Sequence, residues 1–153
     1  MMKKSIWGAL ALVLAACSSS KVDVPRKYEE EVHGLKEVCL YWPASMAKRT
    51  AEMDDVPDAV HKSLKKLGIK SKTVTKSDAC RHVLAVSVRP TRNGQLIEKA
   101  TARVRRVDAD SDVKTQVGQV AYARRGSAKE VAENGGVEAQ IDGMMKQLFR
   151  GEK

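Results

Sequence analysis

Three cysteines, Cys17, Cys39 and Cys80, and the histidine His82 are the residues of this chain that could serve the most different chemical roles. Cys39, Cys80 and His82 could hold a metal ion, two cysteines could form a disulfide, and a free thiol could carry redox or acylation chemistry. Only one residue separates Cys80 from His82, whereas the paired cysteines of zinc sites usually have two to four residues between them. The C-x-x-C pair typical of redox-active thiols does not occur in the sequence. The compartment in which the chain resides decides among these alternatives.

The first 21 residues have the pattern of an export signal. Lys3 and Lys4 supply a positive start, and residues 6–16 form an apolar run that is too short to span a bilayer. Two small residues, Ala15 and Ala16, then precede Cys17. An ordinary secretory signal followed by a coincidental cysteine is the alternative interpretation.

The stretch Leu14-Ala15-Ala16-Cys17 resembles the lipobox of bacterial lipoproteins. The resemblance implies cleavage before Cys17 and attachment of diacylglycerol and an N-acyl chain to that cysteine. We expect no other cofactor. In this family Asp after the cysteine tends to retain the protein at the inner membrane, and here the residue is Ser18. The resemblance therefore implies an outer-membrane lipoprotein that faces the periplasm, with the inner membrane and the cell surface as alternatives.

Export changes the expectation for the other two cysteines. The periplasm is oxidising, so we expect Cys39 and Cys80 to pair with each other. They lie 41 positions apart, and a loop-entropy model gives such a bridge about 4 kcal/mol of stabilisation. Metal binding or redox use stays as the alternative.

The chain is strongly basic, with a formal net charge of +9. A basic periplasmic body favours anionic partners such as phospholipid headgroups, lipopolysaccharide or acidic proteins. Export from the cytoplasm argues against nucleic acid as a partner. Solubility alone would also account for the charge.

Hydrophobic periodicity predicts one folded domain behind the signal. We expect a signal peptide at 1–16, the lipidated cysteine and a flexible tether at 17–35, and a single periplasmic domain at 36–153. Strands are expected at 36–42, 69–76, 82–89, 96–107 and 114–124, with helices at 54–67 and from residue 127 onward. Asn93-Gly94 predicts a hairpin turn between two of the strands.

This order of elements predicts an α+β, two-layer sandwich. The sheet should be mostly antiparallel, with about four to five strands, and two helices should cover one face. Such a sandwich loosely resembles small envelope lipoproteins, including those of lipopolysaccharide assembly and curli secretion.

A cluster of basic residues lies on the two strands of the predicted hairpin. Arg89, Lys99, Arg103 and Arg105 share the parity of the solvent-facing side of the strands, so they could bind an anionic ligand or an acidic partner. The alternative is that these residues only solvate an open sheet face and discourage edge pairing.

The sequence contains no motif that predicts an enzyme. It has no HExxH, GxSxG or P-loop motif. The acidic run that starts at Asp108 does not match a calcium loop, because Val113 and Gln119 occupy the sixth and twelfth positions. We therefore expect a non-enzymatic accessory or assembly factor that makes protein contacts in the envelope. A binding module for anionic lipid or lipopolysaccharide is the alternative.

Overall fold

The computed structural model describes residues 20–49, 55–108 and 113–151. Cys17 and residues 109–112 of the predicted acidic turn lie outside these ranges. Along the chain, the elements are β1 (Ser20–Asp23), the 3-10 turn η1 (Arg26–Tyr28), α2 (Glu29–His33), β2 (Glu37–Tyr41), α3 (Ala44–Arg49), α4 (Asp55–Lys66), β3 (Lys70–Val74), β4 (His82–Pro90), β5 (Ile97–Val107), β6 (Lys114–Ala123) and α5 (Ser127–Arg150).

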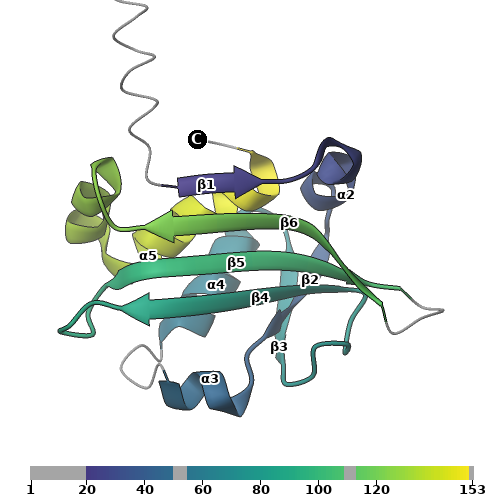
Figure 1. Cartoon of the computed structure of the whole chain (residues 1–153), viewed down its shortest axis with the longest axis horizontal. Helices are drawn as coiled ribbons and strands as arrows, with labels where there is room; N and C mark the ends of the chain where they lie inside the picture. The colour runs from purple at the N-terminus through teal and green to yellow at the C-terminus, as the bar shows by residue number, and fades with distance from the viewer. Residues whose placement is uncertain (1–19, 50–54, 109–112, 152–153) are drawn as a thin grey trace, which may run out of the picture.

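The fold is α+β, as predicted, around a six-stranded sheet in the order β1-β6-β5-β4-β2-β3 (Figure 1). The strands β1, β6, β5 and β4 pair antiparallel, whereas β4, β2 and β3 pair parallel. The sheet is therefore mixed and larger than the expected four to five mostly antiparallel strands. The parallel half arises because α3 and α4 return the chain to start β3 beside β2.

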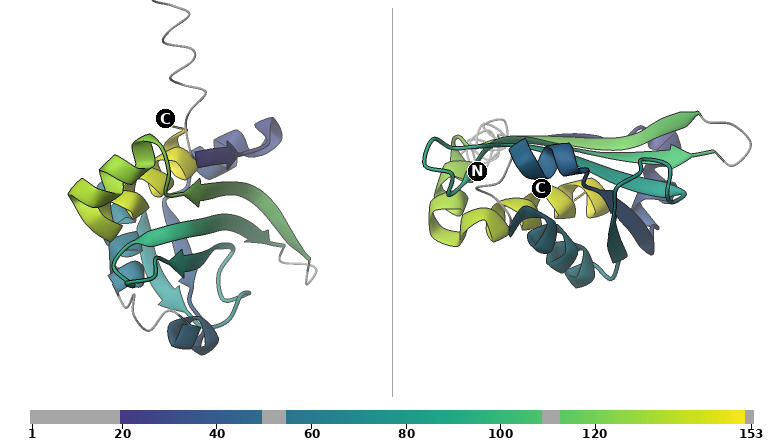
Figure 2. Two further views of the ribbon diagram at one scale, coloured as in Figure 1. Left: turned by 60° about the vertical axis from the view of Figure 1, so that its left-hand side comes forward. Right: turned by 90° about the horizontal axis from the view of Figure 1, so that it is seen from below.

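Helices α4 and α5 cover one face of the sheet (Figure 2). Their apolar stripes meet the inward-facing side chains of the strands, as amphipathic elements require. Gly136, with a φ of 70°, follows Gly135 and breaks α5 by a kink. The largest fully buried side chains of this core include Leu40, Leu64, Leu84, Ile97, Ile141, Met144, Met145, Leu148 and Phe149.

The predicted disulfide between Cys39 and Cys80 is confirmed, with its Cα atoms 6.2 Å apart. Val38 and Leu40 point into the helix-covered core, so Cys39 between them points to the opposite face. The bond therefore holds the 75–81 segment, which links β3 to β4, against that opposite face of β2. The β2–β3 connection contains α4, and the β3–β4 connection is the 75–81 segment, which runs back across the sheet in the opposite direction. Connections of the same hand that run in opposite directions lie on opposite faces of a sheet, so the 75–81 segment lies on the face opposite α4.

The expected tether at 17–35 is wrong for most of its length. Ser20–Asp23 pairs with Gln119–Tyr122 as an edge strand, and Val32 in α2 is fully buried. The sequence signal was weak because three of the four β1 residues are exposed and backbone hydrogen bonds hold the strand. The folded domain thus includes Ser20 rather than starting at residue 36.

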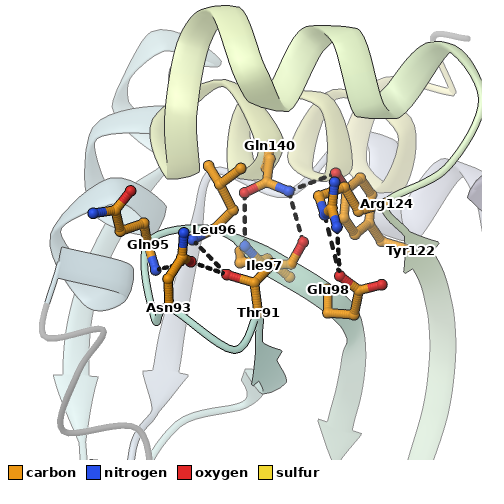
Figure 3. Close-up of polar contacts among 9 residues, drawn as sticks. All are labelled: Thr91, Asn93, Gln95, Leu96, Ile97, Glu98, Tyr122, Arg124 and Gln140. Carbon is orange, nitrogen blue, oxygen red and sulfur yellow. Dashed lines mark hydrogen bonds and ion pairs between the residues drawn. The ribbon is translucent and has the colours of Figure 1, made fainter.

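One buried amide ties α5 to the sheet (Figure 3). The Gln140 Nε2 group donates to the Ile97 carbonyl at 2.8 Å and to the Tyr122 hydroxyl at 2.7 Å. The Gln140 Oε1 atom accepts the Ile97 N–H at 2.9 Å, and only 2% of the residue is exposed. Burial raises the pKa of Tyr122, while the hydrogen bond from Gln140 opposes that rise. This single side chain joins β5, β6 and α5 at one end of the sheet.

We predict that Gln140→Leu destabilises the domain by about 2–4 kcal/mol, because it leaves the buried polar groups of Ile97 and Tyr122 without partners. Gln147→Leu on the same helix is the matched control, since the Gln147 Oε1 atom is buried without a hydrogen-bond partner. Urea unfolding of the two variants measures both free energies. A loss in Gln140→Leu no larger than that in Gln147→Leu would contradict the prediction.

Candidate functional site

The sheet face opposite α4 and α5, which we call the open face, carries the four basic residues that the sequence singles out. Lys99, Arg103 and Arg105 alternate along β5, while the residues between them, Ala100, Ala102 and Val104, are buried in the core. Arg89 lies directly opposite Lys99 on the neighbouring strand β4. The structure therefore brings all four to one face, and we call this set the basic face.

Small or neutral side chains surround the basic face. Arg103 lies between Ala85 of β4 and Gln119 of β6, and its Nε donates to the Gln119 Oε1 atom at 3.0 Å. Ser87 and Thr101 pair beside Arg89 and Lys99. Small side chains, Ala85, Ser87 and Thr101, thus lie between the cations on β4 and β5, which leaves room for a flat or extended partner.

The charges of the basic face are not neutralised within the part of the chain that the structure describes. Arg89, Lys99, Arg103 and Arg105 form no ion pair there, whereas Arg124 pairs with Glu98 at 3.0 Å and Arg106 pairs with Glu31 at 2.6 Å. Four cations on one face without a carboxylate partner raise the local positive potential. The face is suited to hold anionic groups, and Arg adds the bidentate geometry that carboxylates and phosphates accept.

Two hollows border the Arg89 end of the basic face. The smaller, about 290 Å³, is lined by Ser87, Arg89, Lys99 and Thr101. The larger, about 630 Å³, lies beyond the hairpin and is lined by Arg89, Arg92 and Arg124 together with Glu98 and Glu133. The cationic surface therefore extends from β4 and β5 to Arg92 in the hairpin turn. The larger hollow also contains two acidic side chains, Glu98 and Glu133.

A second polar cluster, which the sequence did not reveal, lies at the opposite end of β4 and β5. The Glu31 carboxylate bonds to His82 Nε2 at 2.7 Å and to Arg106 Nη1 at 2.6 Å, while Arg106 Nε donates to Asp108 at 3.1 Å. The Arg106 guanidinium also lies 5.6 Å from the centre of the Tyr28 ring. These contacts hold η1 and α2 against the sheet, and nothing in local spacing links Glu31 to Arg106.

The three residues of the metal alternative, Cys39, Cys80 and His82, have other partners in the structure. The disulfide uses both thiols, and the His82 Nε2 atom faces Glu31. Among the described residues, no three His, Cys, Asp or Glu side chains gather as a metal site would require. The disulfide instead borders a basic cleft of about 500 Å³ lined by Lys36, Lys70, Lys72 and Arg81, among others.

The predicted lipidation site, Cys17, precedes β1 by three positions and lies outside the described residues. Within those residues, no helix has the length and apolar character needed to cross a bilayer.

Comparisons with known proteins give only weak structural similarity. No protein-family model matches the chain, and no curated protein matches it. Among solved structures, the chain is similar to the PelC dodecamer from Paraburkholderia phytofirmans, with 11% identity, a TM-score of 0.39, and coverage of 82% of this chain and 95% of that one. A point variant of that dodecamer gives 10% identity, the same TM-score, and coverage of 82% and 96%. Similarity at this level carries no functional argument.

We predict that replacing Cys39 and Cys80 together by Ala lowers the free energy of unfolding by up to about 4 kcal/mol, because the unfolded chain gains the freedom of a 41-residue loop. Denaturant unfolding with and without reductant measures this. Reductant should destabilise the wild type and leave the double variant unchanged, whereas equal sensitivity of the two proteins would contradict the prediction.

His61 of α4 holds the edge strand β3. Its ring nitrogens bond to the Ser71 hydroxyl at 2.6 Å and to the Thr73 hydroxyl at 2.7 Å. Burial lowers the pKa of His61 below its ordinary value of 6.5, and the nearby Asp58 carboxylate opposes part of that effect. The unfolded chain therefore takes up the proton more readily than the folded chain does.

We predict that the His61 contribution to stability is complete above about pH 6.5 and decreases as the pH falls below that value. The effect should be small, because the ring is partly exposed and water screens it. Unfolding of wild type and His61→Gln from about pH 7.5 to about pH 5.5 tests this. The wild type should lose more stability on acidification, and an equal loss in both proteins would contradict the sign.

Proposed function

We propose that this protein is a non-enzymatic envelope lipoprotein, anchored through Cys17 to the outer membrane and facing the periplasm. It acts as an accessory or assembly factor, and its basic face binds an acidic surface of an envelope protein. The observation that carries this proposal is the convergence of Arg89, Lys99, Arg103 and Arg105 on one uncovered sheet face. The lipobox-like segment supports the location.

The composition of the open face supports binding over simple solvation. A face that only needed solubility would also tolerate carboxylates, yet on β4 and β5 its side chains are basic, small or neutral. Charge of one sign on a flat face favours a partner with the complementary sign.

Anionic lipid or lipopolysaccharide is the second candidate for the same four residues. The observation that favours it is the hollow of about 290 Å³ between Arg89 and Lys99, which would accept a phosphate group. Phosphate recognition would concentrate affinity at that pair, whereas an acidic protein surface would also engage Arg103 and Arg105.

Site-specific photocrosslinking in the native envelope tests the first function. We predict that a photoreactive residue at Thr101, in the middle of the basic face, captures a defined envelope protein, while one at the exposed Lys62 on α4 does not. Arg103→Gln with Arg105→Gln should reduce capture about tenfold or more, since each lost charge pair weakens binding. The double variant Lys62→Gln, Lys65→Gln on α4 is the control: it removes the same amount of charge and should leave capture at Thr101 unchanged.

Two results would overturn the proposal. Capture that is equal from Thr101 and Lys62, or that is unaffected by removal of Arg103 and Arg105, would show that the basic face does not select the partner. Capture of lipopolysaccharide or phospholipid at Thr101 would replace the protein partner by the second candidate.

A further inference from the structure

The start of β1 lies at the same end of the sheet as the β4–β5 hairpin. Ser20 pairs with Tyr122 near the end of β6, and the adjoining Ala123 pairs with Lys99 near the start of β5. Figure 1 shows the start of β1, the β4–β5 turn and the start of α5 on its left-hand side. We call this region, formed by Ser20, residues 91–96 and residues 124–129, the anchor end.

Covalent geometry keeps the anchor end close to residue 17. Three residue steps separate Cys17 from Ser20, and a chain of that length reaches at most about 11 Å. From β1, the hairpin strand β4 is three strand spacings away, about 14 Å across the sheet. A lipid on Cys17 would therefore hold this end of the molecule within reach of the headgroups.

The anchor end presents exposed cations that have no partner. Arg92 in the hairpin, Arg125 after β6 and Lys129 in the first turn of α5 are all exposed and form no ion pair with any described residue. Arg89 and Lys99 add two more charges at the corner shared with the basic face. Glu98 is occupied by Arg124, which leaves Glu130 and Glu133 as the exposed acids nearby.

An exposed apolar side chain accompanies these charges. Val131 is 51% exposed, and it lines a hollow of about 290 Å³ together with Ser20 and Ala128. Basic residues around a partly exposed apolar side chain are typical of surfaces that rest on anionic bilayers.

The hairpin and the strand end are held rigidly relative to each other (Figure 3). Gln140 joins Ile97 of β5 to Tyr122 of β6, and Tyr122 is the residue that pairs with Ser20. The turn closes through Asn93, whose Oδ1 accepts the Gln95 N–H at 3.1 Å, and Gly94 supplies the positive φ. The backbone of the hairpin is thus held in position relative to the first strand.

We propose that the anchor end docks on anionic phospholipid headgroups of the membrane that holds the lipid, with Arg92, Arg125 and Lys129 as the contacting cations. This inference rests on the proposed lipid anchor. The docked domain stands with its strands pointing away from the membrane. Arg105 then lies about 20 Å further along β5 than Lys99, so the outer part of the basic face stays free for a partner.

This orientation can be tested by NMR in nanodiscs that contain a lipid with a paramagnetic label on its headgroup. The acylated full chain is placed in phosphatidylcholine nanodiscs with and without phosphatidylglycerol, and the broadening of backbone amide signals is measured. With phosphatidylglycerol, residues 91–96 and 124–129 should broaden most. In the variant Arg92→Gln, Arg125→Gln, Lys129→Gln, the equilibrium constant for docking should fall roughly a hundredfold, since each basic residue contributes about fivefold.

A variant with the same charge loss at the other end of the sheet is the control. Lys72→Gln, Lys76→Gln and Arg81→Gln remove three exposed cations from β3 and the 75–81 segment, and docking should persist. Uniform broadening, broadening centred on 75–81, or docking that survives in the first variant would overturn the proposal. So would a protein, rather than lipid, covering the anchor end in cells.

Failure of the anchor is recognised separately. A chain that does not copurify with nanodiscs in high salt lacks the lipid, which overturns both the proposed anchoring and this inference. A chain that copurifies but shows no headgroup-directed broadening at the anchor end overturns the docking alone.

Discussion

The pairing of β1 with β6 is the constraint on which the rest of this account depends. Four residues, Ser20–Asp23, add an edge strand to the antiparallel half of the sheet. Their pairing brings the folded body to within three positions of Cys17 and removes the tether that the polar sequence predicts. If Cys17 carries the proposed lipid, the direction of strand β1 rather than a flexible linker sets the position of the domain relative to the membrane.

Two further interactions make the ends of the sheet rigid. At the end where β1 begins, Gln140 bonds to β5 and β6 from within the core. On the open face, the disulfide between Cys39 and Cys80 holds the crossover that links β3 to β4. Arg103 and Arg105 lie on the central strand between these two fixed regions, so a partner would meet a preorganised surface and lose little binding energy to ordering it.

The sequence predicted the elements whose side chains carry a strong period. The α4 stripe of Val56, Val60 and Leu64 and the alternation of β4 and β5 gave the α+β class and the shared face of the four cations. The disulfide between Cys39 and Cys80 was predicted from the oxidising environment expected for an exported chain. Strand β1 and the parallel pairings of β2 could not be predicted from the sequence, because backbone hydrogen bonds and chain crossovers do not produce a periodic pattern of apolar side chains. Gln140 and the Glu31–Arg106 pair depend on contacts between residues 43 and 75 positions apart, which local spacing does not encode.

The folded body starts three positions after Cys17, and we propose that this cysteine carries a lipid. The intact mass of the protein purified from its own envelope, with its attached lipid retained, tests that claim most directly. We expect a chain that begins at Cys17 and carries a diacylglycerol and an N-acyl chain. A chain that retains residues 1–16, or one that begins at or after Cys17 without acyl mass, would contradict the account.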